Sequence, residues 1–364
     1  MTLLDTTGNA FDTPPAFAPL DDLIEPMFWT GTPWLQDDEY VIDCAGLELR
    51  DVDLDPGGEF ARRVRHTYDA NGLVLLVNTG LTDLGRMRAL ARLALADEME
   101  YEGGANPRTR IQPNVYEVGA PLSAWLHYHH EMAYVGRSTS AIGFLCRHAL
   151  PAGRGRTFVS DSIAATDALL ATSFGQKLKD LGLCYHRNLT DRNTFVGQVE
   201  YGVYNHWQRS FDTEDPAVAV ERAEAAGLET EWGPDGLLRT RYHSPAFEYF
   251  PTLDRNVLYS SVADHGMWFD TWPLVQHLPY ADRPLDLTFG DGSPFSSSEL
   301  QQFVDVYDRF GTPIDWNVGD VAVMCNYRFA HGRPGIDLAD GERRELGVVL
   351  GAQFDRVGVR PDRW

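Results

Sequence analysis

Residues 125–134, WLHYHHEMAY, contain four side chains that can bind a metal ion: His127, His129, His130 and Glu131. Alternate residues of an extended strand point to opposite faces, so His130 is expected on one face and the other three on the opposite face. A histidine and a carboxylate two residues apart can supply two members of a facial metal triad. The third ligand has to come from elsewhere in the chain.

Among the eleven histidines, His331 is the best placed to be that ligand. It follows the apolar run VAVMCN and precedes the closing strand, and it lies 202 residues after His129. Two adjacent strand ends of a barrel are compatible with this separation. With His129 and Glu131 it would complete a set of two histidines and one carboxylate, which leaves three positions open for an oxygen-activating Fe(II).

Two further residues suit a ligand that is bound beside such a metal ion. Arg344 lies 13 residues after His331, and Thr157 lies 28 residues after His129. An arginine fork binds a carboxylate through two hydrogen bonds, and a nearby hydroxyl can donate one more. A dicarboxylic ketoacid that spans from the metal to these groups would be held at both ends.

The elements that must position these residues are mostly short strands. Runs rich in β-branched and aromatic residues, broken by Gly and Pro, predict strands at 73–78, 110–119, 126–134, 141–150, 157–162, 321–326, 326–333 and 343–354. Helical spacing and capping residues predict helices at 58–71, 84–100, 162–181, 217–227 and 298–310. The chain is therefore expected to be mainly β with helical insertions (α+β), with its strands packed as a sandwich, jelly roll or barrel.

Residues 1–40 are expected to form an extended N-terminal arm, because prolines interrupt any long regular element there. Residues 41–364 are expected to form a single domain with insertions. The formal net charge of −22 disfavours nucleic acid and anionic membrane surfaces as partners. We expect a cytoplasmic protein with free thiols, since no signal peptide, membrane span or paired cysteine motif is found in the sequence.

The motifs, taken in order, resemble those of a known family. HxE within HHEMAY, a glycine-containing turn before Thr157, W-x-x-GD, HGR and RR-x-L look like the Fe(II)/2-oxoglutarate-dependent oxygenases of the taurine dioxygenase and clavaminate synthase-like superfamily. HHEM, FGDGSP and NYRFAHGR are most similar to the branch that includes syringomycin-type amino-acid hydroxylases. The resemblance covers roughly residues 60 to 355.

This resemblance implies a double-stranded β-helix core (jelly roll, cupin-like) with iron held by His129, Glu131 and His331. It assigns Arg344 and Thr157 to the distal carboxylate of 2-oxoglutarate, the cosubstrate that is used with O2. The neighbouring Arg343 remains an alternative to Arg344. Val348 stands where many relatives carry a second arginine, which leaves open what contacts the cosubstrate's inner carboxylate.

The resemblance also implies the reaction. We expect a dioxygenase that hydroxylates an unactivated C–H bond of an amino acid or related small natural-product precursor, free or tethered to a carrier protein, while 2-oxoglutarate becomes succinate and CO2. Glu131 argues against halogenation, because halogenases of this superfamily leave the carboxylate position vacant. Desaturation, cyclisation or another oxidation at the same iron site is the alternative, and a non-catalytic cupin-like binding protein is the rival from another class.

Overall fold

The computed structural model describes residues 33–35, 38–49, 54–95, 97–101, 108–151, 153–194, 206–262 and 283–364. Most of the arm expected over residues 1–40 lies outside these residues. The described part includes Trp34, whose indole Nε1 donates to the Phe310 carbonyl at 3.1 Å and whose ring stacks on Phe329 with 5.8 Å between centroids. Among the described residues, no helix has the length and hydropathy that crossing a membrane requires.

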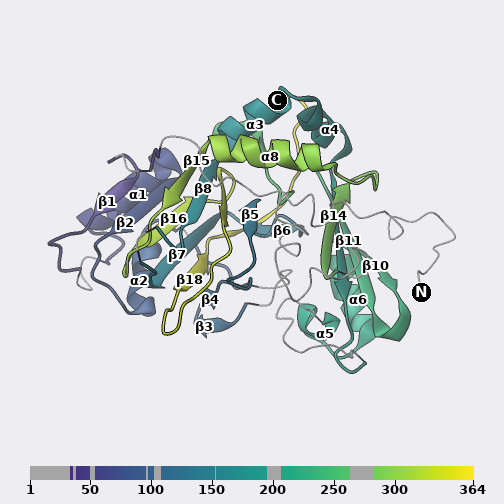
Figure 1. Cartoon of the computed structure of the whole chain (residues 1–364), viewed down its shortest axis with the longest axis horizontal. Coiled ribbons are helices and arrows are strands. Elements are labelled where there is room, and N and C mark those ends of the chain that lie inside the picture. The colour runs from purple at the N-terminus through teal and green to yellow at the C-terminus, as the bar shows by residue number, and fades with distance from the viewer. Residues whose placement is uncertain are drawn as a thin grey trace.

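Two β-sheets face each other and form the core (Figure 1). The larger sheet has the strand order β1 (Val41–Asp43), β2 (Leu73–Val77), β16 (Val321–Cys325), β7 (Ala141–His148), β18 (Glu345–Leu350), β4 (Val115–Glu117) and β3 (Arg110–Gln112). The smaller sheet has the order β15 (Gly311–Ile314), β8 (Thr157–Asp161), β17 (Phe329–Arg333) and β5 (Leu126–His129). Strands far apart in sequence are neighbours in both sheets, as in the jelly-roll core that was predicted.

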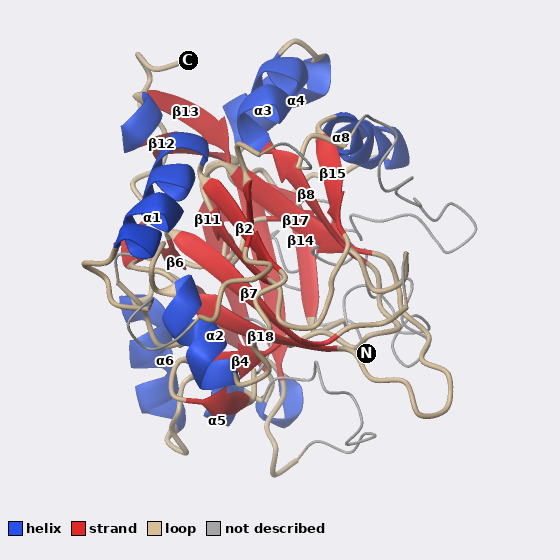
Figure 2. Cartoon of the chain, turned by 90° about the vertical axis from the view of Figure 1, so that its left-hand side faces the viewer, coloured by secondary structure: helices blue, strands red, loops and turns tan. Residues whose placement is uncertain are grey.

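The strands of the larger sheet are apolar on both faces because both faces are covered. In β2, Leu73 and Leu75 pack into the core between the sheets, whereas Val74 and Leu76 pack under the helices α1 (Glu59–Asn71) and α2 (Leu84–Ala91). Figure 2 shows these helices in front of the larger sheet. Double burial explains why the sequence of this strand does not alternate.

The smaller sheet turns alternate residues of β8 and β17 to opposite faces, and a bulge interrupts the pairing of β17 with β5. Its outward residues Tyr128, Phe158 and Ala330 pack under helices. These helices are α3 (Ser162–Leu170), α4 (Ser173–Leu181) and α8 (Ser297–Arg309). The period of two therefore turns the neighbouring residues of β5, β8 and β17 toward the larger sheet.

A further sheet lies beside this core, to the right in Figure 1. Its strand order is β10 (Glu229–Trp232), β11 (Leu238–Ser244), β9 (Leu183–Leu189) and β14 (Leu285–Phe289), with α5 (Trp207–Ser210) and α6 (Pro216–Ala225) packed beside it. Two short pairs complete the strands: β12 (Phe247–Phe250) with β13 (Arg255–Leu258), and β19 (Gln353–Asp355) with β6 (Arg137–Thr139). Short 3₁₀ turns are η3 (Pro234–Gly236), within the β10–β11 hairpin, and η4 (Pro251–Leu253).

Several predicted elements end earlier than expected. The helix expected over 84–100 stops at Ala91, since the following chain turns to pair Glu98 with Gly351 beside β18. The helix expected over 162–181 is divided into α3 and α4, because the Thr172 side chain caps a new helix start. The strand expected over 126–134 ends at His129.

Candidate metal centre and cosubstrate pocket

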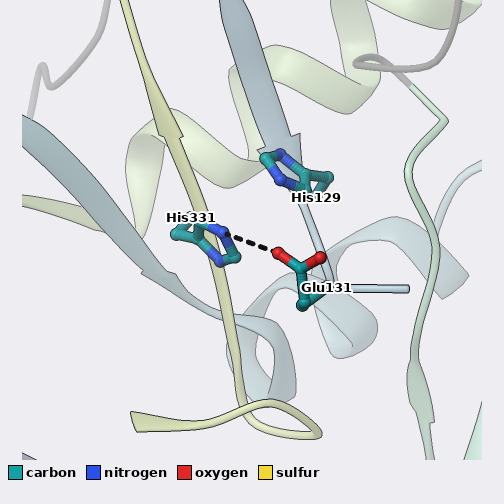
Figure 3. A group of neighbouring side chains, drawn as sticks. All are labelled: His129, Glu131 and His331. Carbon is teal, nitrogen blue, oxygen red and sulfur yellow. Dashed lines mark ion pairs between the residues drawn. The ribbon is translucent and has the colours of Figure 1, made fainter. Parts of the chain in front are cut away.

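The register of two strands brings the predicted histidines together. β5 and β17 pair antiparallel with His129 directly opposite His331, and their ring centroids are 4.4 Å apart. Both side chains point inward, and Glu131 joins them from the chain just beyond β5 (Figure 3). One ligand atom from each of the three residues lies within 4.8 Å of the others, a spacing that can hold a metal ion.

Glu131 reaches this position from a turn, and not from the strand that the sequence suggested. Its backbone N–H donates to Asn326 Oδ1 at 2.8 Å, and its carbonyl accepts from Asn326 Nδ2 at 2.9 Å. The same carbonyl accepts from the Ser138 hydroxyl at 2.9 Å, and the next residue, Met132, has a left-handed φ of 57°. The buried Asn326 amide thus fixes the turn that aims the carboxylate. Nothing in the sequence singled out Asn326.

The surroundings of His129 and His331 favour the neutral imidazole forms that can bind a metal ion. His129 Nδ1 lies 2.8 Å from the carbonyl of His127, and a carbonyl can only accept, so Nδ1 carries the proton and Nε2 keeps its lone pair. Burial lowers the pKa of His331 well below its usual range, and the positive charge of Arg108 adds to the effect. Two neutral imidazoles and one carboxylate form a donor set that suits Fe(II).

The two other histidines of the stretch lie outside this group. His130 points away from it, with Nε2 2.9 Å from the Ser162 hydroxyl and Nδ1 3.1 Å from the Ser260 carbonyl. Burial lowers the pKa of His130 to about 3, and it lowers that of His127 to about 3 as well. Both rings are therefore neutral at ordinary pH and support the fold.

A pocket extends from His129 and His331 between the two sheets. Its walls are formed by Arg108, Val118, Leu126, His129, Phe144, Thr157, His331, Gly332, Arg333, Arg344, Leu346 and Val348. The predicted cosubstrate residues Thr157 and Arg344 therefore share one pocket with the two histidines. Leu346 and Val348 lie on the same face as Arg344, as the strand periodicity predicted.

The hydroxyl of Thr157 is oriented by its neighbours. It accepts from Trp316 Nε1 at 2.9 Å and from Arg344 Nη2 at 3.5 Å. A hydroxyl has two acceptor positions and one donor, so its proton remains available for an incoming acceptor. Trp316 belongs to the W-x-x-GD motif, and this contact gives that tryptophan a role which the sequence did not reveal.

Arg344 and Arg343 face different surroundings. Arg344 Nε donates to the Gly155 carbonyl at 3.0 Å, and a Cβ at Gly155 would lie 3.1 Å from Arg344 Cδ, so glycine permits this close approach. Burial lowers the pKa of Arg344 to about 10, which leaves it charged at neutral pH. The Arg343 side chain is 69% exposed and pairs with Glu345 at 3.2 Å. Arg344 alone of the two lines the pocket.

The sequence did not single out Arg108, which also lines the pocket. It precedes β3, and its Nη2 donates to Glu131 Oε2 at 2.8 Å. Its only distinguishing mark in the sequence is a basic residue shortly before a strand, which is too common to be informative. Arg333 of the HGR motif also lines the pocket, and its guanidinium donates to the carbonyls of Pro121, Leu122 and Ala124.

The chain is similar to several known proteins. A clavaminate synthase-like protein of Arabidopsis thaliana is 29% identical over 246 residues, which cover 66% of this chain and 71% of that protein. A putative alpha-ketoglutarate-dependent taurine dioxygenase from Burkholderia xenovorans has a TM-score of 0.46 at 15% identity and covers 84% of this chain and 83% of its own. The structure of AAD-2 in complex with Mn(II) and N-oxalylglycine has a TM-score of 0.48 at 15% identity, covering 88% of this chain and 96% of that one.

The family is given by a match over most of the chain. The model described as "Taurine catabolism dioxygenase TauD, TfdA family" matches residues 35–350, which include all five predicted site residues. The donor set between the sheets is the one that such enzymes require. The chain therefore belongs to the TauD, TfdA family, and it is an Fe(II)- and 2-oxoglutarate-dependent dioxygenase.

Proposed function

We propose that this dioxygenase hydroxylates an unactivated C–H bond of an amino acid or a related small natural-product precursor, as in the syringomycin-type branch that its motifs resemble. His129, Glu131 and His331 hold the iron. The observation that carries the proposal is the convergence of their ligand atoms within 4.8 Å, beside a pocket in which Thr157 and Arg344 join the two histidines. Bound iron supplies the oxygen-activating chemistry that couples decarboxylation of 2-oxoglutarate to oxidation of the substrate.

Thr157 and Arg344 bind the distal carboxylate of 2-oxoglutarate. The Arg344 fork is held by Gly155 and Thr157, so little side-chain freedom is lost when the carboxylate arrives. The free proton of the Thr157 hydroxyl donates to the same carboxylate. Val348 is apolar where many relatives have arginine, so it adds no second cation beside Arg344.

Glu131 favours hydroxylation over halogenation. A carboxylate that occupies the third ligand position leaves no site there for chloride. Phe144, Leu346 and Val348 give the pocket apolar walls that exclude water from the reacting groups. These walls protect the oxidising chemistry from wasteful side reactions.

Anaerobic addition of Fe(II) and then 2-oxoglutarate tests the proposed site. We expect a weak visible charge-transfer band in the wild-type protein and none in the Glu131→Ala variant. The exposed Glu117→Ala variant is the matched control and should give the wild-type band. A protein that binds neither ligand would be a cupin-like binding protein and would contradict the proposal.

Mass spectrometry of amino-acid pools incubated with enzyme, iron, ascorbate, O2 and 2-oxoglutarate tests the reaction. A product that has gained one oxygen atom, formed together with succinate, supports hydroxylation. A product that has lost two hydrogen atoms identifies a desaturase or cyclase and overturns the hydroxylase proposal, while the iron site stands.

A further inference from the structure

Arg108 is a buried cation whose described partner is a proposed metal ligand. Its side chain is 11% exposed, and its Nη2 lies 2.8 Å from Glu131 Oε2. The guanidinium also stands over the ring of Tyr101, 5.3 Å from the centroid. Among the residues that the structure describes, no atom accepts a hydrogen bond from Arg108 Nε or Nη1.

Metal binding changes what Glu131 can offer to Arg108. A carboxylate that shares its charge with a divalent ion is a weaker partner for a guanidinium. A buried charge that loses its partner is destabilising unless another group compensates it. In the loaded enzyme, Arg108 therefore requires a second anionic group near the metal.

A count of formal charges shows whether the cosubstrate can supply this second anionic group. The divalent iron, Arg344 and Arg108 together bring four positive charges. Glu131 and the two carboxylates of 2-oxoglutarate bring three negative charges, and each cosubstrate carboxylate already has a cationic partner, the iron or Arg344. Of the two arginines counted here, Arg108 is the one whose carboxylate partner, Glu131, is shared with the proposed metal ion.

The surroundings of Arg108 suit a carboxylate. Burial raises the pKa of Tyr101, so this phenol stays protonated and adds no negative charge beside Arg108, with which it shares a hydrogen bond. A second buried guanidinium, Arg187 of β9, lies near enough to Tyr101 to favour its ionised form electrostatically, as Arg108 does. This side of the pocket is therefore positive, although the whole chain has a net charge of −22.

We propose that Arg108 binds the carboxylate of the substrate, and that the substrate is a free amino acid or another free carboxylic acid. A substrate tethered to a carrier protein presents a thioester in place of this carboxylate, and a thioester has no charge with which to neutralise the guanidinium. This inference rests on the proposed function, and it makes Arg108 a specificity-determining residue.

The test compares acids with their uncharged esters in the anaerobic complex with Fe(II) and 2-oxoglutarate. The probes are the twenty L-amino acids and straight-chain monocarboxylic acids, each with its methyl ester. Binding is followed as a shift of the charge-transfer band. The variants are Arg108→Met, Arg108→Lys and the control Arg110→Met, whose side chain is 49% exposed.

We expect the wild-type protein to bind its preferred free acid at least about tenfold more tightly than the methyl ester, as for a hydrogen bond to a charged group. Arg108→Met should bind acid and ester alike, Arg108→Lys should recover part of the preference, and Arg110→Met should match wild type. A purely structural role would weaken the acid and the ester equally and would leave their ratio unchanged. That result overturns the proposal, as does a panel in which no free acid binds.

Two further measurements distinguish a failure of the Arg108 proposal from a failure of the proposed function. Affinity for Co(II), followed by its absorption, should be unchanged or higher in Arg108→Met, because a competing cation has been removed. Affinity for 2-oxoglutarate should also be retained, and a large loss there would show that Arg108 serves the cosubstrate instead. Absence of the charge-transfer band in the wild-type protein would contradict the proposed function itself.

Discussion

The two arginines of the pocket, Arg344 and Arg108, are held in different ways. Arg344 is fixed by two neutral groups of the protein, the Gly155 carbonyl and the Thr157 hydroxyl, and Trp316 orients that hydroxyl in turn. Arg108 is paired with Glu131, a carboxylate that is also a proposed metal ligand. The Arg344 end is therefore preorganised, whereas the Arg108 end changes its electrostatic state when the metal binds.

This difference suggests a division of labour. A preorganised fork suits a cosubstrate that is the same in every turnover, since less conformational entropy is lost on binding. A guanidinium whose partner is withdrawn by the metal suits a ligand that should bind only to the loaded enzyme. We therefore expect mutations at the Arg344 end and at the Arg108 end of the pocket to weaken different ligands.

The largest effect is expected for Glu131→Ala. The substitution removes a proposed ligand and the described partner of Arg108 together, so Co(II) affinity should fall by more than about 100-fold, beyond the range for residues that only orient ligands. Co(II) absorption measures the loss, circular dichroism checks the fold, and Glu117→Ala is the surface control. Retention of normal affinity would remove Glu131 from the metal site.

Arg344→Met is expected to affect the other end alone. Losing a charge-assisted, two-point contact should raise the dissociation constant of 2-oxoglutarate by about 30-fold. The exposed Arg343→Met is the matched control and should bind 2-oxoglutarate normally. Co(II) affinity should be unchanged in both variants. If Arg343→Met weakened 2-oxoglutarate binding instead, Arg343 and not Arg344 would be the residue that binds the cosubstrate.

Asn326→Ala tests whether metal binding depends on the hydrogen bonds between the Asn326 side chain and the Glu131 backbone. The Glu131 turn loses its contacts to the amide, so Co(II) affinity should fall by about tenfold, as for a residue that orients a ligand. Thermal unfolding should also move to lower temperature, because buried backbone groups lose their partners. Asn193→Ala, at an exposed position, is the control. Unaltered Co(II) binding would mean that the turn holds its shape without Asn326.

Trp316→Phe should give the smallest effect. It retains an aromatic ring but removes the N–H that orients Thr157, so 2-oxoglutarate affinity should fall by about fivefold, the value of one neutral hydrogen bond. Isothermal titration measures this change, with the 40% exposed Trp232 as the control position for the same substitution. A loss as large as that of Arg344→Met would show that Trp316 supports the arginine as well as the threonine.

Much of the fold could be predicted because its signals are local. The run LVLLV predicts a strand buried on both faces, and β2 is covered on one side by α1 and α2 and on the other by the smaller sheet. Helix ends were predicted less well. The helix from Leu84 ends early because pairing of Glu98 with Gly351 stabilises an extended chain there, and a single sequence contains no sign of that distant partner.

The sequence alone determined the chemical types at the site. HxE, His331, Thr157 and Arg344 stand out because few side chains can ligate iron or bind a carboxylate with a fork, and their order in the chain can be read directly.

Only the tertiary structure decided how these side chains are oriented. The turn that carries Glu131 depends on Asn326, 195 residues away, and the choice of Arg344 over Arg343 depends on which one faces inward ahead of β18. Arg108 is placed at the pocket by its ion pair with Glu131, and a single sequence shows no pattern for this contact because the fold brings the two residues together.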